Sequence, residues 1–262
     1  EKPIPAARKL TPFIGVFTAA VVTLATLYKG LRHVLSGAEW LTSPVAILIS
    51  VGVGILAAAV GKVLINRSLH ENGHRSLGDQ LQQVERLYAP LVIVTSCCVA
   101  FAHGANDVAN AVGPLAAVVE IVRSGTVQMT VAVPFWILAL GGVGIVLGLA
   151  TFGHRVMLTV GEKITQITPS RGVAADLAAT VTVLACSRLG LPVSTTHTLV
   201  GAILGVGLAR GLGAVNRRVT ANIFGSWFIT VPAAAGMCIV LFLLGRVFLL
   251  EHVVHLIQVT PA

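Results

Sequence analysis

Long apolar runs without a single charged residue constrain this chain more than any other feature. A helix needs about 20 predominantly apolar residues to cross a bilayer. Charged residues make up only 11% of the chain, against roughly 25% in soluble domains, so a water-soluble or disordered chain is excluded. The sequence therefore predicts an all-α, polytopic helix bundle in a membrane. The clearest uncharged runs are Leu10–Tyr28, Trp40–Gly61, Gly125–Gly153 and Val219–Gly245.

The net charge of +8 is explained by membrane topology, so no nucleic-acid partner is expected. Lys and Arg collect in cytoplasmic loops of membrane proteins. Two spans separate the basic N-terminal arm from the charged segment 62–86, which places both on one side, and we predict the cytoplasmic side. We expect two domains: residues 1–86 with two membrane helices and a charged cytoplasmic loop, and residues 87–262 with the polar motifs.

A polar cluster at His103–Ala111 interrupts an otherwise apolar stretch. An aspartate such as Asp107 costs about 2.5–3.5 kcal/mol at the centre of a membrane helix, so a partner must offset that cost. The side-chain oxygens of Asn106, Asp107 and Asn110 are hard ligands that suit hard cations. Because broken membrane helices bind coupling ions in this way, we expect a helix break and a cation site here. The alternative is a loop at the membrane face, in which Asp107 is solvated or caps a helix.

A second cluster, Pro192–His197, has the composition of a helix N-terminus. Helix N-termini present free amides that bind oxyanions, and Ser194, Thr195 and Thr196 add hydroxyl donors. The apolar stretch Leu199–Arg210 behind them is too short to cross a bilayer, which indicates a re-entrant hairpin. An ordinary N-cap with spare hydroxyls is the alternative.

Asp176 is the third candidate, because an acid inside an apolar helix marks a functional site by default. An intramembrane enzyme is the competing class, suggested by the spacing of His103 and Asp107 and by Ser194 near His197. However, no Glu stands between two His residues as in a zinc protease, and no glycine elbow precedes Ser194. We therefore expect no enzymatic activity.

Three motifs together resemble the signature of the inorganic phosphate transporter (PiT) family. In chain order they are GANDVANAVGP at 104–114, TPSRG at 168–172 and LPVSTTH at 191–197. The resemblance implies a secondary active transporter of the cell (inner) membrane, which moves inorganic phosphate with sodium or protons and has no other cofactor. It also implies two inverted repeats that together frame one site.

Carried over by resemblance, the phosphate-binding residues are Asn106, Ser194, Thr195 and Thr196. The cation-binding residues are Asp107, Asn110 and Asp176, with sodium at Asp107. The family often has Glu where Asp176 stands, so the shorter side chain is a departure.

Only one copy of each motif occurs in this chain, and the Gly113-Pro114 continuation resembles the C-terminal repeat. We therefore expect the C-terminal half of a longer transporter, with the N-terminal repeat missing. A sulfate permease of the same family and a non-transporting half-length membrane module are the two alternatives. A homodimer is compatible with the sequence.

Overall fold

The computed structural model describes residues 3–26, 43–68 and 76–247, and every regular element in these ranges is helical. Five helical segments are long and apolar enough to cross a membrane, which confirms the predicted all-α membrane fold. They are Pro3–Leu24, Pro44–Val63, Leu77–Ser124, Phe135–Lys163 and Arg217–Gly245. The chain forms two compact units, Glu1–Ala214 and Val215–Ala262. The domain boundary expected after residue 86 stays a prediction.

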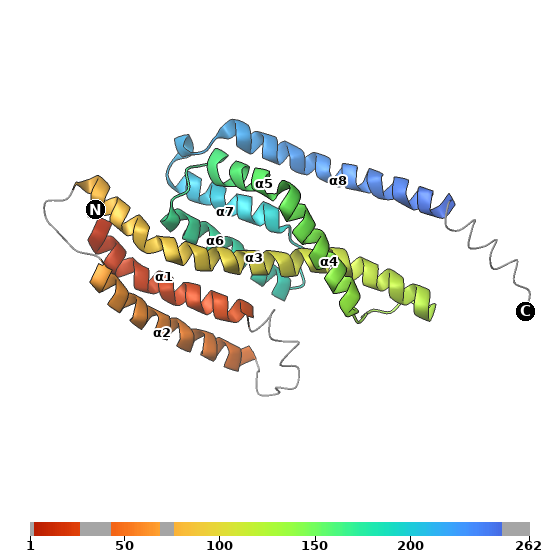
Figure 1. The fold of residues 1–262 in the computed structure, drawn as a ribbon, viewed down its shortest axis with the longest axis horizontal. Helices are drawn as coiled ribbons and strands as arrows, with labels where there is room; N and C mark the ends of the chain where they lie inside the picture. Colours follow the sequence, from red (N-terminus) through yellow and green to blue (C-terminus); the bar gives the residue numbers. More distant parts are fainter. Residues whose placement is uncertain (1–2, 27–42, 69–75, 248–262) are drawn as a thin grey trace, which may run out of the picture. The chain divides into compact units, whose positions relative to one another are not determined.

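Helices α1 (Pro3–Ala25) and α2 (Ser43–Ser68) lie side by side (Figure 1). Gly54 permits this packing, because a Cβ atom there would lie only 2.9 Å from the carbonyl oxygen of Val16. Residues 69–75, the middle of the expected charged loop, lie outside the described part of the chain.

Helix α3 (Leu77–Ser124) runs for 48 residues. At 1.5 Å per residue it is about 72 Å long, more than twice the hydrocarbon thickness of about 30 Å, so part of it lies outside the hydrocarbon. The helix break expected at His103–Asp107 is absent, since α3 continues through these residues. Side-chain partners described below satisfy Asn106 and Asp107, so the backbone need not open to supply ligands.

A second long helical stretch follows, composed of α4 (Phe135–Gly148), η2 (Leu149–Gly153), α5 (His154–Leu158) and η3 (Thr159–Lys163). Ile137 of α4 is fully buried against Val112 and Ala116 of α3. A Cβ atom at Gly141 would approach Val112 to 2.7 Å, so the absence of a side chain permits this close helix contact.

Helices α6 (Pro169–Arg188) and α7 (Thr195–Ala209) form the predicted helical hairpin. Gly190 in the turn has φ +69°, a conformation that strains any L-residue with a side chain. Helix α7 has 15 residues, a length of about 22 Å. Neither α6 nor α7 is among the segments that meet the length and hydropathy expected of a span. The hairpin is followed by η4 (Leu212–Ala214).

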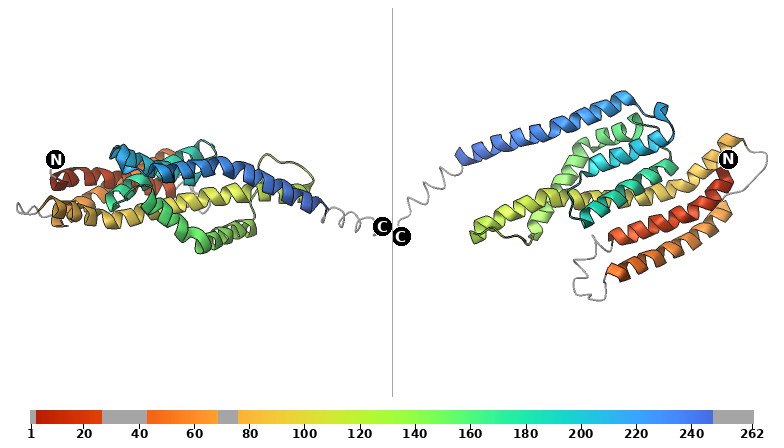
Figure 2. Two further views of the ribbon diagram at one scale, coloured as in Figure 1. Left: turned by 90° about the horizontal axis from the view of Figure 1, so that it is seen from above. Right: turned by 180° about the vertical axis from the view of Figure 1, so that it is seen from behind.

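The core of the first unit is where α6 packs against α3 and α1 (Figure 2). Tyr88 of α3 lies against Val173 and Leu177 of α6, and Ile14 of α1 covers this cluster. The Tyr88 hydroxyl and Thr11 Oγ1 of α1 are hydrogen-bonded at 3.0 Å. These contacts bring the first turns of α1 and α6 to the level of residues 84–88 of α3.

The second unit contains α8 (Arg217–Gly245). Asn216 caps it by accepting a hydrogen bond from the Val219 amide at 3.2 Å. Phe224 and Trp227 meet edge to face with ring centroids 4.6 Å apart.

Candidate functional site

The tip of the α6–α7 hairpin contacts the middle of α3 at Asp107. Thr195 Oγ1 donates a hydrogen bond of 2.9 Å to Asp107 Oδ1, and Asn106 Nδ2 donates one of 3.1 Å to the carbonyl oxygen of Val193. Asn106 and Thr195 are buried, with 8% and 3% of their surfaces exposed. Two polar clusters that the sequence places nearly 90 residues apart are therefore parts of one site.

The Asp107 carboxylate has the Thr195 hydroxyl and the Asn106 amide at Oδ1, has His103 at Oδ2, and is partly exposed to solvent. Its Oδ1 also lies 3.4 Å from Asn106 Nδ2, and about a third of the side chain is exposed. No Lys or Arg of the described residues forms an ion pair with it. A partly exposed carboxylate without a Lys or Arg partner is a suitable place for a mobile cation.

His103, which the sequence suggested only as part of the enzyme alternative, is a further neighbour of Asp107. Its Nε2 lies 2.7 Å from Asp107 Oδ2, one helical turn away. The four-residue spacing was the available signal, because residues i and i+4 share a helix face. This contact requires a continuous helix, whereas the sequence predicted a break here.

Ser194 is the N-cap of α7, as the alternative interpretation of this cluster predicted. Its Oγ accepts a hydrogen bond from the His197 amide at 3.3 Å and lies 2.5 Å from His197 Nδ1. Thr195 is buried against α3, whereas Thr196 is exposed. The amides of the first helical turn have no carbonyl partner within their own helix, so the tip keeps the properties of an anion site.

Asn110 and Asp176 lie apart from the contact between Asp107 and Thr195. Asn110 is exposed on α3, one turn beyond Asn106. Asp176 Oδ2 accepts hydrogen bonds from Thr95 Oγ1 at 2.9 Å and from Ser96 Oγ at 2.7 Å. These two residues precede Asp107 by eleven or twelve positions in α3, a distance of about 17 Å along a helix. The structure thus forms a second cluster of oxygen atoms between α3 and α6.

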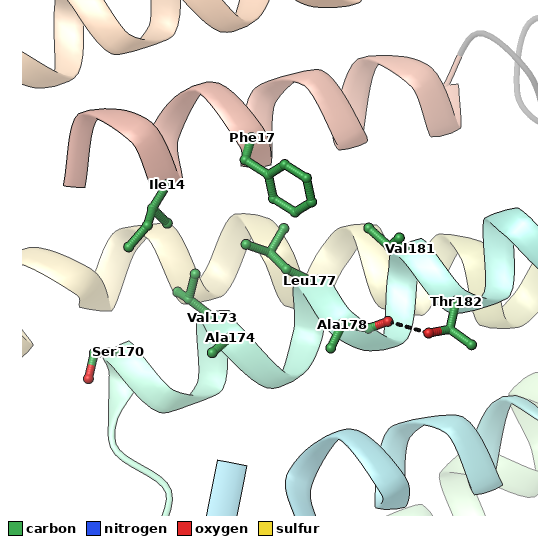
Figure 3. A pocket seen from close by; sticks show the side chains of 9 residues that line it. All are labelled: Ile14, Phe17, Ser170, Val173, Ala174, Leu177, Ala178, Val181 and Thr182. Atoms are coloured by element: carbon green, nitrogen blue, oxygen red, sulfur yellow. Dashed lines mark hydrogen bonds between the residues drawn. The ribbon is translucent and has the colours of Figure 1, made fainter. Parts of the chain in front are cut away.

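A groove of about 460 Å³ lies between α1 and α6 (Figure 3). Ile14 and Phe17 of α1 face Leu177 and Val181 of α6 across it, and its hydroxyls are those of Ser170 and Thr182. Thr182 Oγ1 is bonded to the Ala178 carbonyl of its own helix at 2.8 Å. Apart from these hydroxyls the groove is lined by apolar side chains, and none of the predicted site residues lines it.

Comparison with known proteins identifies the family. A sequence profile of the phosphate transporter family matches residues 1–238. The chain belongs to this family. The resemblance first seen in three short motifs therefore extends over most of the sequence, including α1 and α2.

Individual relatives are similar to this chain over more than half of its length. A Haemophilus influenzae protein named provisionally as a phosphate permease is 43% identical over 250 residues, which are 94% of this chain and 58% of that protein. An Arabidopsis thaliana protein named chloroplastic inorganic phosphate transporter 2-1 is 46% identical over 62% of this chain and 28% of its own length.

A solved structure, described as the sodium-dependent phosphate transporter, superposes with a TM-score of 0.76 at 38% identity. It covers 95% of this chain, which in turn covers 59% of that structure. The chain thus spans little more than half the length of the Haemophilus influenzae protein and of the solved transporter.

Proposed function

We propose that the full-length protein moves inorganic phosphate across a membrane together with a cation. The observation that carries the proposal is the contact between Thr195 and Asp107, which joins an anion-suited helix N-terminus to an accessible carboxylate. Similarity to a sodium-dependent phosphate transporter over 95% of the chain supports it. Of the two cations expected from the sequence, sodium is favoured because the similar solved structure is described as a sodium-dependent transporter.

The roles of the site residues follow from their chemistry. We assign phosphate binding to Asn106, Ser194, Thr195 and Thr196, through side-chain donors and the amides at the start of α7. Asp107 and Asn110 supply carboxylate and amide oxygens for sodium, and the cation offsets the negative charge of the substrate. The rest of the full-length protein completes the site with a second, inverted copy of both clusters, as the family resemblance implies.

The Thr195 hydroxyl gives a direct route to coupling. A hydroxyl group has one hydrogen to donate, and in this structure it is donated to Asp107. A sodium ion on the Asp107 oxygens competes with that hydrogen bond. The released hydroxyl can then donate to a phosphate oxygen, so cation binding prepares the anion site.

Asp176 is assigned to a second cation site. The carboxylate oxygen Oδ2 and the hydroxyl oxygens of Thr95 and Ser96 form a group of three oxygen atoms between α3 and α6. The hydroxyl groups now donate to the carboxylate, and they can instead turn their lone pairs toward a bound ion. Two monovalent cations, one at each carboxylate, balance the charge of a phosphate dianion.

The variant Asp107→Asn tests this function. It keeps the size of the side chain and removes its charge, so we expect cation-coupled phosphate uptake to disappear while the amount of protein in the membrane is unchanged. Asp79→Asn is the matched control, because Asp79 lies in the exposed first turn of α3. Uptake of labelled phosphate is measured in proteoliposomes with sodium and pH gradients varied separately.

Undiminished uptake with a normal cation dependence in Asp107→Asn would contradict the assignment. Competition by unlabelled sulfate in the same assay separates a phosphate transporter from a sulfate permease. Phosphate can donate as well as accept hydrogen bonds at neutral pH, whereas sulfate only accepts them. A site that also offers hydrogen-bond acceptors to its ligand therefore binds phosphate in preference to sulfate.

A further inference from the structure

Two arginines converge at the open end of the α6–α7 hairpin, opposite its tip. Arg171 lies in the first turn of α6, and Arg210 is the C-cap of α7. Their Nη1 atoms donate to the same acceptor, the carbonyl oxygen of Gln166, at 3.2 and 3.5 Å. The distance between the two Nη1 atoms is therefore no greater than the sum of these two hydrogen-bond lengths.

This pair of like charges has no acidic partner in the described part of the chain. Asp107 forms an ion pair with His103, and neither guanidinium takes part in it. Glu85, which contacts the same turn of α6, accepts hydrogen bonds from the amide and hydroxyl of Ser170 at 2.8 and 2.7 Å. A shared carbonyl dipole orients the two arginines but does not neutralise them.

We propose that Arg171 and Arg210 together bind the oxyanion of a phosphate group. A guanidinium presents several N–H donors in a planar fork that matches phosphate oxygens, and one Nη1 donor on each arginine leaves the other donors available. The charge of the anion removes the repulsion between the arginines. The 15 residues of α7 separate this place from the hairpin tip, a distance of about 22 Å, so it is distinct from the site at Asp107.

The phosphate group has two sources, inorganic phosphate and the headgroup of an anionic phospholipid. If the ligand is inorganic phosphate, the two arginines raise its local concentration at this end of the hairpin. A positive surface steers an anionic substrate in this way. That role in substrate capture rests on the proposed transport function. Binding itself does not, because it can be measured without transport.

Equilibrium binding of labelled inorganic phosphate to the purified full-length protein tests the proposal. The protein is reconstituted in nanodiscs of phosphatidylcholine and carries Asp107→Asn, so that the proposed transport site is impaired in every sample. We expect the double variant Arg171→Gln, Arg210→Gln to bind phosphate about tenfold more weakly, the size of one or two charge-assisted hydrogen bonds. Arg123→Gln, which removes one positive charge at the other end of α3, is the control and should bind normally.

A second set of nanodiscs contains phosphatidylglycerol, and the lipid retained by the protein is quantified by mass spectrometry. Loss of phosphate binding in the double variant supports a site for inorganic phosphate. Loss of retained phosphatidylglycerol alone supports the same site occupied by a headgroup. Unchanged phosphate binding and unchanged lipid retention would overturn the proposal and leave the arginines a purely topological role.

A conservative variant guards against misfolding. Arg171→Lys with Arg210→Lys keeps both charges but removes the planar forks, and we expect binding about threefold weaker than in the parent. Thermal unfolding of each variant identifies any that fail to fold. Absence of phosphate uptake by the full-length protein with Asp107 intact would overturn the transport function but would not alter these binding measurements.

Discussion

At the scale of single residues, the Thr195 hydroxyl is central to the proposed mechanism. Its hydrogen bond to Asp107 links the hairpin to α3, and in the proposed mechanism the hydroxyl redirects this hydrogen bond from the carboxylate to the substrate. A hydroxyl bonded to a charged group contributes about 1.5–3 kcal/mol. A change in this one atom should therefore be visible in transport.

Thr195→Val removes the hydroxyl and leaves the shape of the side chain almost unchanged. We expect phosphate uptake to fall by about tenfold or more, in line with a lost charge-assisted hydrogen bond. The measurement is the initial rate of uptake, normalised to the amount of protein in the membrane. Thr182→Val is the control, because that exposed hydroxyl bonds only to its own helix at Ala178. Equal rates in both variants would remove Thr195 from the mechanism.

Asp176→Asn tests the second cation site separately from the first. It removes the charge that the Thr95 and Ser96 hydroxyls surround, so we expect the sodium concentration for half-maximal uptake to rise about tenfold. Ser96→Ala removes one neutral ligand and should produce a smaller increase in the same direction. An unchanged sodium dependence in Asp176→Asn would mean that this carboxylate is structural.

At the scale of helices, local patterns predicted the hairpin well and the contacts of the site poorly. The proline and hydroxyl residues at 192–196 predicted the start of α7, and the short apolar stretch behind them predicted its hairpin. The sequence also predicted that Asp107 in an apolar segment carries a free-energy cost. It did not predict which residues offset the cost of Asp107. Its partner Thr195 and the Val193 carbonyl bonded by Asn106 come from a turn nearly 90 residues later, which no local pattern reveals.

The same limit explains the helix break that was expected and is absent. Glycine and asparagine near residue 104 are typical of a broken membrane helix, but side-chain partners on the hairpin satisfy the polar groups of an unbroken one. The pairing of Asp176 with Thr95 and Ser96 was also invisible in the sequence, because hydroxyl residues are common in apolar helices. Tertiary contacts decided each of these features.

Gly190→Ala tests the turn that positions the hairpin tip. Gly190 has φ +69°, where a Cβ atom costs about 1–2 kcal/mol. We expect a lower thermal unfolding midpoint and reduced uptake, because the tip at Thr195 shifts relative to Asp107. Gly201→Ala is the matched control in the middle of α7, where an added Cβ atom meets nothing within 4 Å. It should be neutral or stabilising by up to about 1 kcal/mol, so equal destabilisation of the two variants would argue against a strained turn.

At the scale of the whole first unit, four helices bring basic residues to one end. The start of α1 packs at Val84 and Leu87 of α3, Glu85 of α3 bonds to the start of α6, and α7 ends beside the Gln166 carbonyl. The basic residues at this level are Arg8, Lys9, Arg86, Arg171 and Arg210. The sequence showed an excess of basic residues only in the N-terminal arm and one loop. In the folded unit, the same excess is found at one end of the helix bundle.

Because Lys and Arg accumulate on the cytoplasmic side of membrane proteins, we predict that this end of the unit faces the cytoplasm. Single cysteines at the exposed positions Lys9 and Arg86 should react with a membrane-impermeant thiol reagent in inside-out vesicles and not in intact cells. The background is a full-length protein whose native cysteines are replaced by alanine or serine and which retains phosphate uptake. Both positions must give the same sidedness, because α1 and α3 are packed together at this level. Labelling of either position in intact cells would invert the predicted orientation and place the arginine pair at the extracytoplasmic surface.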